Sequence, residues 1–141
     1  MLKFYYAVGS AAYAPHILLE DIGAEYEAVR IDFKSGEQRS ADYLAINPKG
    51  RLPSLVTDKG VLTETPAILL YLGQMSPEHN LVPQDPFEFA TALAFNLYMA
   101  STVHVAHAHK HRGHRWADDV AAHDSMRAKV LENMTDCAEM I

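Results

Sequence analysis

The sequence predicts an α/β domain built on a small mixed sheet, followed by a helical region too short to form a complete second domain. Three observations carry this. Short apolar runs alternate with helical patterns through the first half of the chain and are separated by glycine and proline. A segment with three prolines, residues 77–86, then cannot continue a helix. Beyond it, Ala, Leu, Phe and Met recur at helical spacing, which predicts two long helices over about residues 87–111 and 116–140.

Each element of the first half has a local signal. An apolar run with aromatic residues predicts a strand over residues 2–8. The helix that follows has Pro15 in its first turn, where the missing N–H costs little, and Gly23 as its stop. The further expected elements are a strand at 26–31, a helix at 40–46, strands at 54–57 and 61–63 joined by a turn at 58–60, and a helix at 65–75 with Thr65 as N-cap.

The order β-α-β-α-β-β-α is the thioredoxin-like arrangement, a parallel βαβ crossover followed by an antiparallel hairpin. We therefore expect a thioredoxin-like domain over residues 1–76, a linker over 77–86 and a partial all-α domain over 87–141. Asp118 or Asp119 is expected to cap the second long helix.

The composition limits which partners and which cellular compartment we expect for this protein. A net charge of −6 argues against nucleic acid as a partner. The apolar runs reach only about eight residues, too short to span a bilayer, so no membrane partner is expected. The chain enters a strand pattern directly, so no secretory signal is expected. Cys137 is the only cysteine, so there is no disulfide framework, which favours a reducing cytoplasm.

The most informative stretch is residues 46–56 followed by 62–68. Pro53 can neither donate a hydrogen bond nor lie inside a central strand, so it belongs at a strand start or edge. If the Leu52–Pro53 bond is cis, the Leu52 N–H and C=O face outward and can pair with an extended, peptide-like ligand. Glu64 and Thr65 stand at a helix N-terminus, where free amides accept a carboxylate and Glu64 can meet an ammonium.

This pattern, together with the run Phe4–Ser10 and its distance to Pro53, resembles the glutathione S-transferase family. The resemblance covers essentially the whole chain and is most specific at residues 46–72. It implies a cytoplasmic detoxification enzyme that conjugates the thiolate of glutathione to an electrophilic small molecule. Glutathione is then a co-substrate, and no cofactor is expected. It also implies a homodimer with the 65–75 helix and the first long helix at its interface, and a longer helical domain than this chain contains.

Ser10 is the first candidate for activating the thiol. A free thiol has a pKa of about 8.5, and one hydroxyl donating to the sulfur lowers that value. Ser10 follows the first strand and, with Gly9, matches the Gly-Ser of the serine-type members; the alternative is a turn serine. Tyr6 matches the tyrosine-type members in its spacing to Pro15, and is equally well explained as a core residue. Where cysteine-type bacterial members carry Cys and Ser, this chain has alanines at 11 and 12, which removes a mixed-disulfide mechanism.

The resemblance also implies a set of peptide-binding residues. A tripeptide with two carboxylates needs a cation at one end and an amide nest at the other. Lys49 or Arg51 can supply the cation and Thr65 the nest, although each cation can equally be a solvated loop charge. Gly50 and Pro66 depart from the residues that many members carry. The glutathione-binding residues expected are Lys49, Arg51, Leu52, Pro53, Glu64 and Thr65, with Gln38 and Arg39 reaching toward the glycine end.

A histidine cluster occupies the end of the first long helix and the residues just after it. His104, His107, His111 and His114 are spaced 3, 4 and 3, and a pair at i and i+4 is a competent metal-ligand spacing. Cations at 110, 112 and 115 would repel a divalent ion, so we expect no metal. His104 resembles a histidine that lines the second-substrate pocket of cysteine-type bacterial members; the alternative is a packed histidine.

The sequence thus predicts a glutathione transferase that acts on a small electrophile, and it leaves open whether this 141-residue chain is active by itself. The alternative is a non-catalytic relative used as a binding or regulatory protein. A glutathione-dependent reductase or peroxidase is disfavoured, because it needs a redox cysteine near the first turn.

Overall fold

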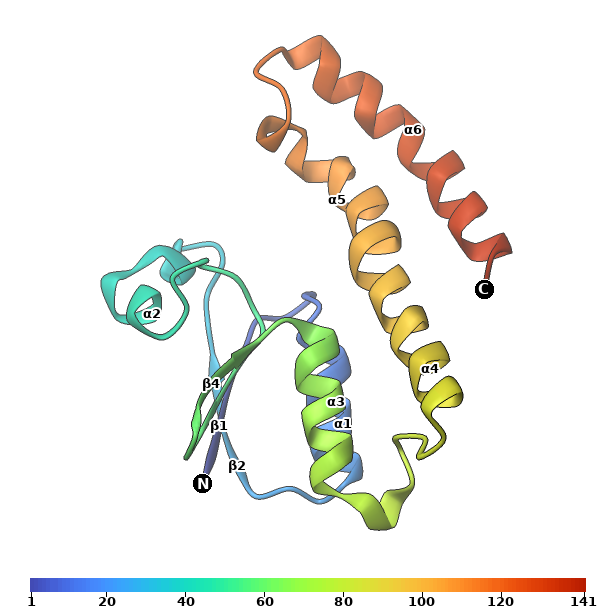
Figure 1. Cartoon of the computed structure of the whole chain (residues 1–141). Helices are drawn as coiled ribbons and strands as arrows, with labels where there is room; N and C mark the ends of the chain where they lie inside the picture. Colours follow the sequence, from blue (N-terminus) through green and yellow to red (C-terminus); the bar gives the residue numbers. More distant parts are fainter. The chain divides into compact units, whose positions relative to one another are not determined.

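The computed structural model describes all 141 residues (Figure 1). It divides into two compact units, Met1–Phe89 and Ala90–Ile141. The first unit confirms the thioredoxin-like order of strands and helices. Its elements are β1 (Leu2–Tyr6), α1 (Tyr13–Asp21), β2 (Tyr26–Arg30), η1 (Glu37–Arg39), α2 (Ala41–Ile46), β3 (Ser54–Thr57), β4 (Gly60–Thr63), α3 (Thr65–Met75) and η2 (Pro77–His79).

The sheet has the strand order β2-β1-β3-β4. β1 pairs in parallel with β2 across the α1 crossover and antiparallel with β3. β3 and β4 form the expected hairpin, in which Thr57 pairs with Gly60, so only two residues make the turn. Gly60 has a φ of 137°, a value that L side chains rarely adopt.

Alternation along β1 decides which helix covers which face of the sheet. The rings of Phe4 and Tyr6 lie 5.5 and 4.8 Å from the His16 ring of α1. The ring of Tyr5 points the other way and lies 5.7 Å from the Tyr43 ring of α2. Helices α1 and α3 therefore lie together on one face and α2 lies on the other (Figure 1). The buried core between the sheet and the helices α1 and α3 comprises Phe4, Ala12, Leu19, Leu55, Ile68 and Leu72.

The helix ends follow the expected signals, with two corrections. Gly23 stands just beyond α1 with a φ of 62°. Ser40, expected as the first residue of its helix, instead precedes α2, and its hydroxyl accepts from the Tyr43 N–H at 3.2 Å to cap the helix. The prediction that Thr65 caps α3 is wrong, because Glu64 occupies the N-cap position and Thr65 is the first helical residue. The Thr65 hydroxyl is directed instead to the carbonyl oxygen of Ala11, at 3.3 Å.

The expected linker, residues 77–86, folds back on the first unit. It contains η2, and Val82 lies so close to Gly73 of α3 that a Cβ on this glycine would meet the Val82 Cγ2 at 2.7 Å. The contact-based boundary accordingly falls after Phe89. The domain limits drawn from the sequence stay predictions.

The second unit is an antiparallel helical pair. Helix α4 (Pro86–Tyr98) begins in the first unit and continues through a π-helical segment, η3 (Met99–Val103), into α5 (His104–Arg112). The chain turns through η4 (Gly113–Arg115) and returns as α6 (Val120–Glu139) along α5. The Tyr98 hydroxyl donates to the carbonyl oxygen of Cys137 at 3.3 Å, a hydrogen bond that joins the end of α4 to the C-terminal part of α6. Asp119 accepts from the Ala121 N–H at 3.1 Å, so it is the cap of α6, and Cys137 is buried as expected.

One helical run, Pro86–Arg115, is long and apolar enough to cross a membrane by length and composition; its best 18-residue window has a mean hydropathy of 1.2. Only 6% of this window is buried within the structure, and a single such run is weak evidence for a membrane span. The expectation of no membrane partner stays a prediction.

Candidate functional site

The Leu52–Pro53 peptide bond is cis, the condition on which the predicted backbone site depended. Pro53 is buried directly before β3. Neither the N–H nor the C=O of Leu52 makes a hydrogen bond within the protein. Leu52 therefore presents one free donor and one free acceptor at the entrance to β3, which is what an extended peptide ligand requires.

A buried polar network fixes the loop before Leu52. The carbonyl oxygen of Arg51 accepts from the Tyr43 hydroxyl at 2.7 Å and from Nδ2 of Asn47 at 2.8 Å. The hydroxyl of Ser54 completes the network, 2.9 Å from the Tyr43 hydroxyl and 3.1 Å from Nδ2 of Asn47. Asn47 is 1% exposed, and burial raises the pKa of Tyr43. The loop is thus held from beneath, and sequence reasoning missed this network; the only signals were Asn47 before a proline and a serine opening a strand.

The helix α3 begins at an unusual residue. Glu64 has a φ of 73° and a ψ of 124°, a conformation that non-glycine residues rarely adopt and that is often found at functional sites. No side chain caps the helix, and Pro66 has no N–H to satisfy. The amides of the first turn and the positive end of the helix dipole are therefore open to a ligand carboxylate.

Lys49 lies at this same end of the site. Its Nζ is 2.9 Å from Oγ1 of Thr63 and forms an ion pair with the carboxylate of Glu64. The sequence prediction paired Lys49 with the end of the ligand opposite Thr65, and in the free protein the structure places it beside Glu64 instead. The side chain of Arg51 makes no contact of this kind and is exposed, so it remains available to a ligand.

The loop after β1 meets the start of α3. The Thr65–Ala11 hydrogen bond joins residues 54 positions apart and brings the Ser10 turn beside Glu64 and Thr65. The Ser10 hydroxyl donates to the carbonyl oxygen of Ala7 at 2.7 Å and accepts from the Ala12 N–H at 3.3 Å. In the free protein Ser10 therefore closes its own turn, and its proposed role toward a thiol is not tested by these contacts.

Tyr6 belongs to an aromatic cluster. Its ring is parallel to the ring of Phe4 at 6.2 Å and packs on His16, and Tyr26 completes the cluster. The hydroxyl of Tyr6 makes no hydrogen bond. This surrounding fits the packing alternative, and the catalytic role of Tyr6 stays a prediction.

Gln38 and Arg39 lie in η1, packed against the turn that carries Gly50. Gly50 has a φ of 58°, and a Cβ there would lie 2.8 Å from Nη1 of Arg39 and 2.9 Å from the carbonyl oxygen of Gln38. Oε1 of Gln38 is buried and has no hydrogen-bond partner. The structure thus brings both residues to the loop before Leu52, on the side of Gly50.

His104 lies in the second unit, as the first residue of α5, and is exposed. Its assignment to a second-substrate pocket stays a prediction. No three side chains of His, Cys, Asp or Glu come close enough to one another to hold a metal ion.

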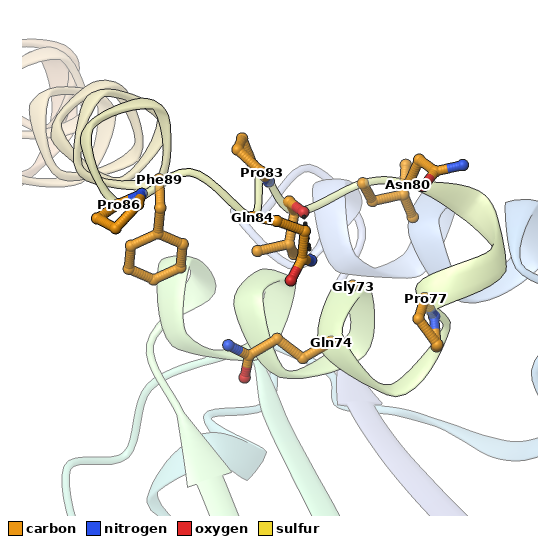
Figure 2. A pocket seen from close by; sticks show the side chains of 10 residues that line it. Gly73, Gln74, Pro77, Asn80, Pro83, Gln84, Pro86 and Phe89 are labelled. Carbon is orange, nitrogen blue, oxygen red and sulfur yellow. Dashed lines mark hydrogen bonds between the residues drawn. The ribbon is translucent and has the colours of Figure 1, made fainter.

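A separate cavity of about 460 Å³ lies at the other end of α3 (Figure 2). Gln74, Gln84 and Phe89 surround it in Figure 2, and no charged side chain lines it. With a rise of about 1.5 Å per residue, α3 separates this cavity from Glu64 by roughly 15 Å. The cavity lacks the charges that a zwitterionic tripeptide needs, so it is distinct from the candidate site.

Comparison with known proteins agrees with this geometry. Residues 1–74 match the model of the glutathione S-transferase N-terminal domain. The glutathione S-transferase GstA of Escherichia coli O157:H7 is 33% identical over 106 residues, 73% of this chain and 53% of the relative. The maleylacetoacetate isomerase of Pseudomonas aeruginosa is 32% identical over 110 residues, 75% of this chain and 52% of the relative.

Solved structures extend the likeness to the whole chain. A glutathione transferase homologue from Sulfitobacter, crystallised with bound glutathione, superposes with a TM-score of 0.94 at 45% identity. It covers 99% of this chain, which in turn covers 67% of the homologue. A sphingomonad glutathione S-transferase in complex with glutathione superposes with a TM-score of 0.80 at 31% identity, covering 95% of this chain and 65% of that one.

The chain spans about half the length of these curated relatives. The match to the family model nevertheless covers residues 1–74, more than half of the chain, including the cis-proline loop and the start of α3. The chain therefore belongs to the glutathione S-transferase family.

Proposed function

We propose that this protein binds glutathione and conjugates it, through its thiolate sulfur, to a small electrophile. The observation that carries the proposal is the free backbone pair of Leu52, held by the buried Tyr43–Asn47 network next to the open N-terminus of α3. The bound glutathione in the Sulfitobacter homologue supports the same ligand.

Each part of the tripeptide has a counterpart at this site. The backbone of the cysteinyl residue pairs with the N–H and C=O of Leu52, and Pro53 fixes the position of this pair. The ammonium of the γ-glutamyl residue meets the Glu64 carboxylate, and its carboxylate meets the first-turn amides around Thr65. The glycine carboxylate meets cationic or amide side chains on the other side of the loop, namely Arg51, Gln38 or Arg39.

The chemistry then needs a thiolate. Ser10 rotates from the Ala7 carbonyl oxygen and donates its hydrogen bond to the sulfur, which stabilises the anion. The thiol proton leaves to solvent. The sulfur lone pair forms a C–S bond to the electrophilic carbon, and the leaving group departs with its bonding pair. Tyr6 is the alternative donor.

A non-catalytic binding protein is the second candidate, and the Ser10–Ala7 hydrogen bond favours it, because the only serine on the loop is already paired. The cytoplasmic setting, the homodimer, the detoxification role and the electrophile are also proposals. A screen of electrophiles should include maleylacetoacetate, for which two relatives are named.

Isothermal titration of glutathione into the 141-residue chain tests the proposal. Glu64→Ala should weaken binding about tenfold or more, which corresponds to about 1.4 kcal/mol. Glu25→Ala is the matched control, since Glu25 is an exposed carboxylate outside the site. If wild type and both variants bind nothing, the proposed function fails. Binding without turnover of any electrophile would favour the second candidate.

A further inference from the structure

We propose that Lys49 is a positioning residue for the γ-glutamyl end of glutathione, where it holds the Glu64 carboxylate in place for the ligand's ammonium. This inference rests on the proposed function and changes the expected role of one residue. Lys49 then does not bind the glycine carboxylate, and the two cations of the loop have different tasks.

The first observation is how firmly the stem of Lys49 is anchored. Its N–H donates to Oδ1 of Asn47 at 3.2 Å, and Asn47 is itself buried in the network beneath the loop. From this fixed backbone the Lys49 side chain reaches across 14 and 15 sequence positions to Thr63 and Glu64. Thr63 ends β4, so the ammonium is held between the strand end and the first residue before α3.

The second observation is that Glu64 has no other means of orientation. Its side chain does not cap α3, it is 59% exposed, and Lys49 is the only partner of its carboxylate. Without Lys49, the Glu64 side chain would rotate freely and would have to be ordered each time a ligand binds. Ordering one long side chain weakens binding by roughly 3- to 10-fold.

The third observation is that the ion pair leaves room for the ligand. Lys49 bonds Oε1 of Glu64, and no hydrogen bond is made to Oε2. A carboxylate offers about four acceptor positions, so the ammonium of the γ-glutamyl residue can bind Oε2 without displacing Lys49. The exposed Arg51 guanidinium remains for the glycine carboxylate.

The experiment compares three ligands by isothermal titration: glutathione, γ-glutamylcysteine, which lacks the glycine, and N-glutaryl-cysteinylglycine, which lacks the ammonium. Lys49→Met should weaken glutathione and γ-glutamylcysteine by the same roughly 3- to 10-fold factor and leave the glutaryl analogue unchanged. Lys49→Arg should restore most of the affinity, and Arg51→Met should weaken only the ligands that contain glycine.

A double-mutant cycle tests whether Lys49 acts on the ligand through the Glu64 carboxylate. In a Glu64→Gln background, Lys49→Met should have no further effect on glutathione, because its action passes through the carboxylate. Three results would overturn the inference: a Lys49→Met effect that vanishes with γ-glutamylcysteine, one that persists with the glutaryl analogue, or no effect on glutathione at all.

The ligand-free protein separates this inference from the proposed function. If wild type does not bind glutathione, the proposed function fails. The ion pair between Lys49 and Glu64 can still be detected by NMR in the ligand-free protein. The chemical shift of the Glu64 carboxyl carbon should differ between wild type and Lys49→Met. An identical shift in both proteins would show that Lys49 does not hold Glu64.

Discussion

The Ser10 hydroxyl donates a hydrogen bond of 2.7 Å to the carbonyl oxygen of Ala7, three residues before it. The same hydroxyl accepts from the Ala12 N–H at 3.3 Å, so it closes the turn between β1 and α1. The serine proposed to stabilise a thiolate thus closes its own turn in the free protein. Two measurements distinguish the turn contact from the proposed catalytic role, because loss of the first changes the free energy of unfolding and loss of the second changes kcat/KM and its pH dependence.

Ser10→Ala tests the catalytic role. A hydrogen bond to a charged group is worth about 1.5–3 kcal/mol, so kcat/KM with an aryl halide should fall roughly 10- to 100-fold near neutral pH. The rate should recover as pH rises toward the pKa of a free thiol, about 8.5. Tyr6→Phe is the control and should leave the pH profile in place. An unchanged rate in Ser10→Ala together with a loss in Tyr6→Phe would transfer the role to Tyr6.

The buried network beneath the loop should matter for stability. Asn47→Ala removes the donor to both the Arg51 carbonyl and the Ser54 hydroxyl, inside a region that water does not reach. Both acceptors keep the Tyr43 hydroxyl as a partner, so the variant loses the net contribution of each deleted hydrogen bond, about 0.5–1.5 kcal/mol, and the urea midpoint should fall accordingly. Gln74→Ala, an exposed amide on α3, should change it little. Equal midpoints for the two variants would contradict a structural role for the network.

Gly50 and Gly36 make a matched pair. Both have a positive φ, 58° and 77°, so alanine at either position carries the backbone cost of about 1 kcal/mol. A Cβ at Gly36 enters open space, whereas a Cβ at Gly50 collides with Arg39 and the backbone of Gln38. Gly50→Ala should therefore destabilise the protein more than Gly36→Ala in urea unfolding, and it should also weaken glutathione binding. Similar losses at both sites would mean that η1 moves aside at no cost.

The free energy of unfolding at alkaline pH should depend on the phenol of Tyr26. Burial, assisted by a hydrogen bond to Glu20, raises the pKa of Tyr26 to about 12 from an ordinary value of 10.0. The folded state then holds the phenol proton more tightly than the unfolded state, so stability is full below pH 10 and falls as pH rises toward 12. Tyr26→Phe should flatten part of that decline in urea midpoints measured at several pH values. A wild-type decline that the variant reproduces fully would assign the effect to other groups.

Local signals in the sequence determined most of the fold. The proline in the first turn of α1, the glycine after α1 and the glycine of the β3–β4 turn act within a few residues, and each marked its element. The elements in their order then required the parallel crossover and the hairpin. The same kind of signal identified Pro53 and the acidic residue before α3, and both lie within residues 1–74, which the family model matches.

The tertiary structure decided what the site residues touch. Glu64 took the N-cap position expected for Thr65, with a backbone conformation that no sequence pattern announces. Lys49 joined Glu64, and Thr65 joined Ala11 across 54 positions, because the loops after β1, before β3 and after β4 meet at the same end of the strands. Residue type and spacing fix the chemistry that a chain can offer. Which charge meets which depends on packing between segments that are distant in sequence, and only the folded chain contains that information.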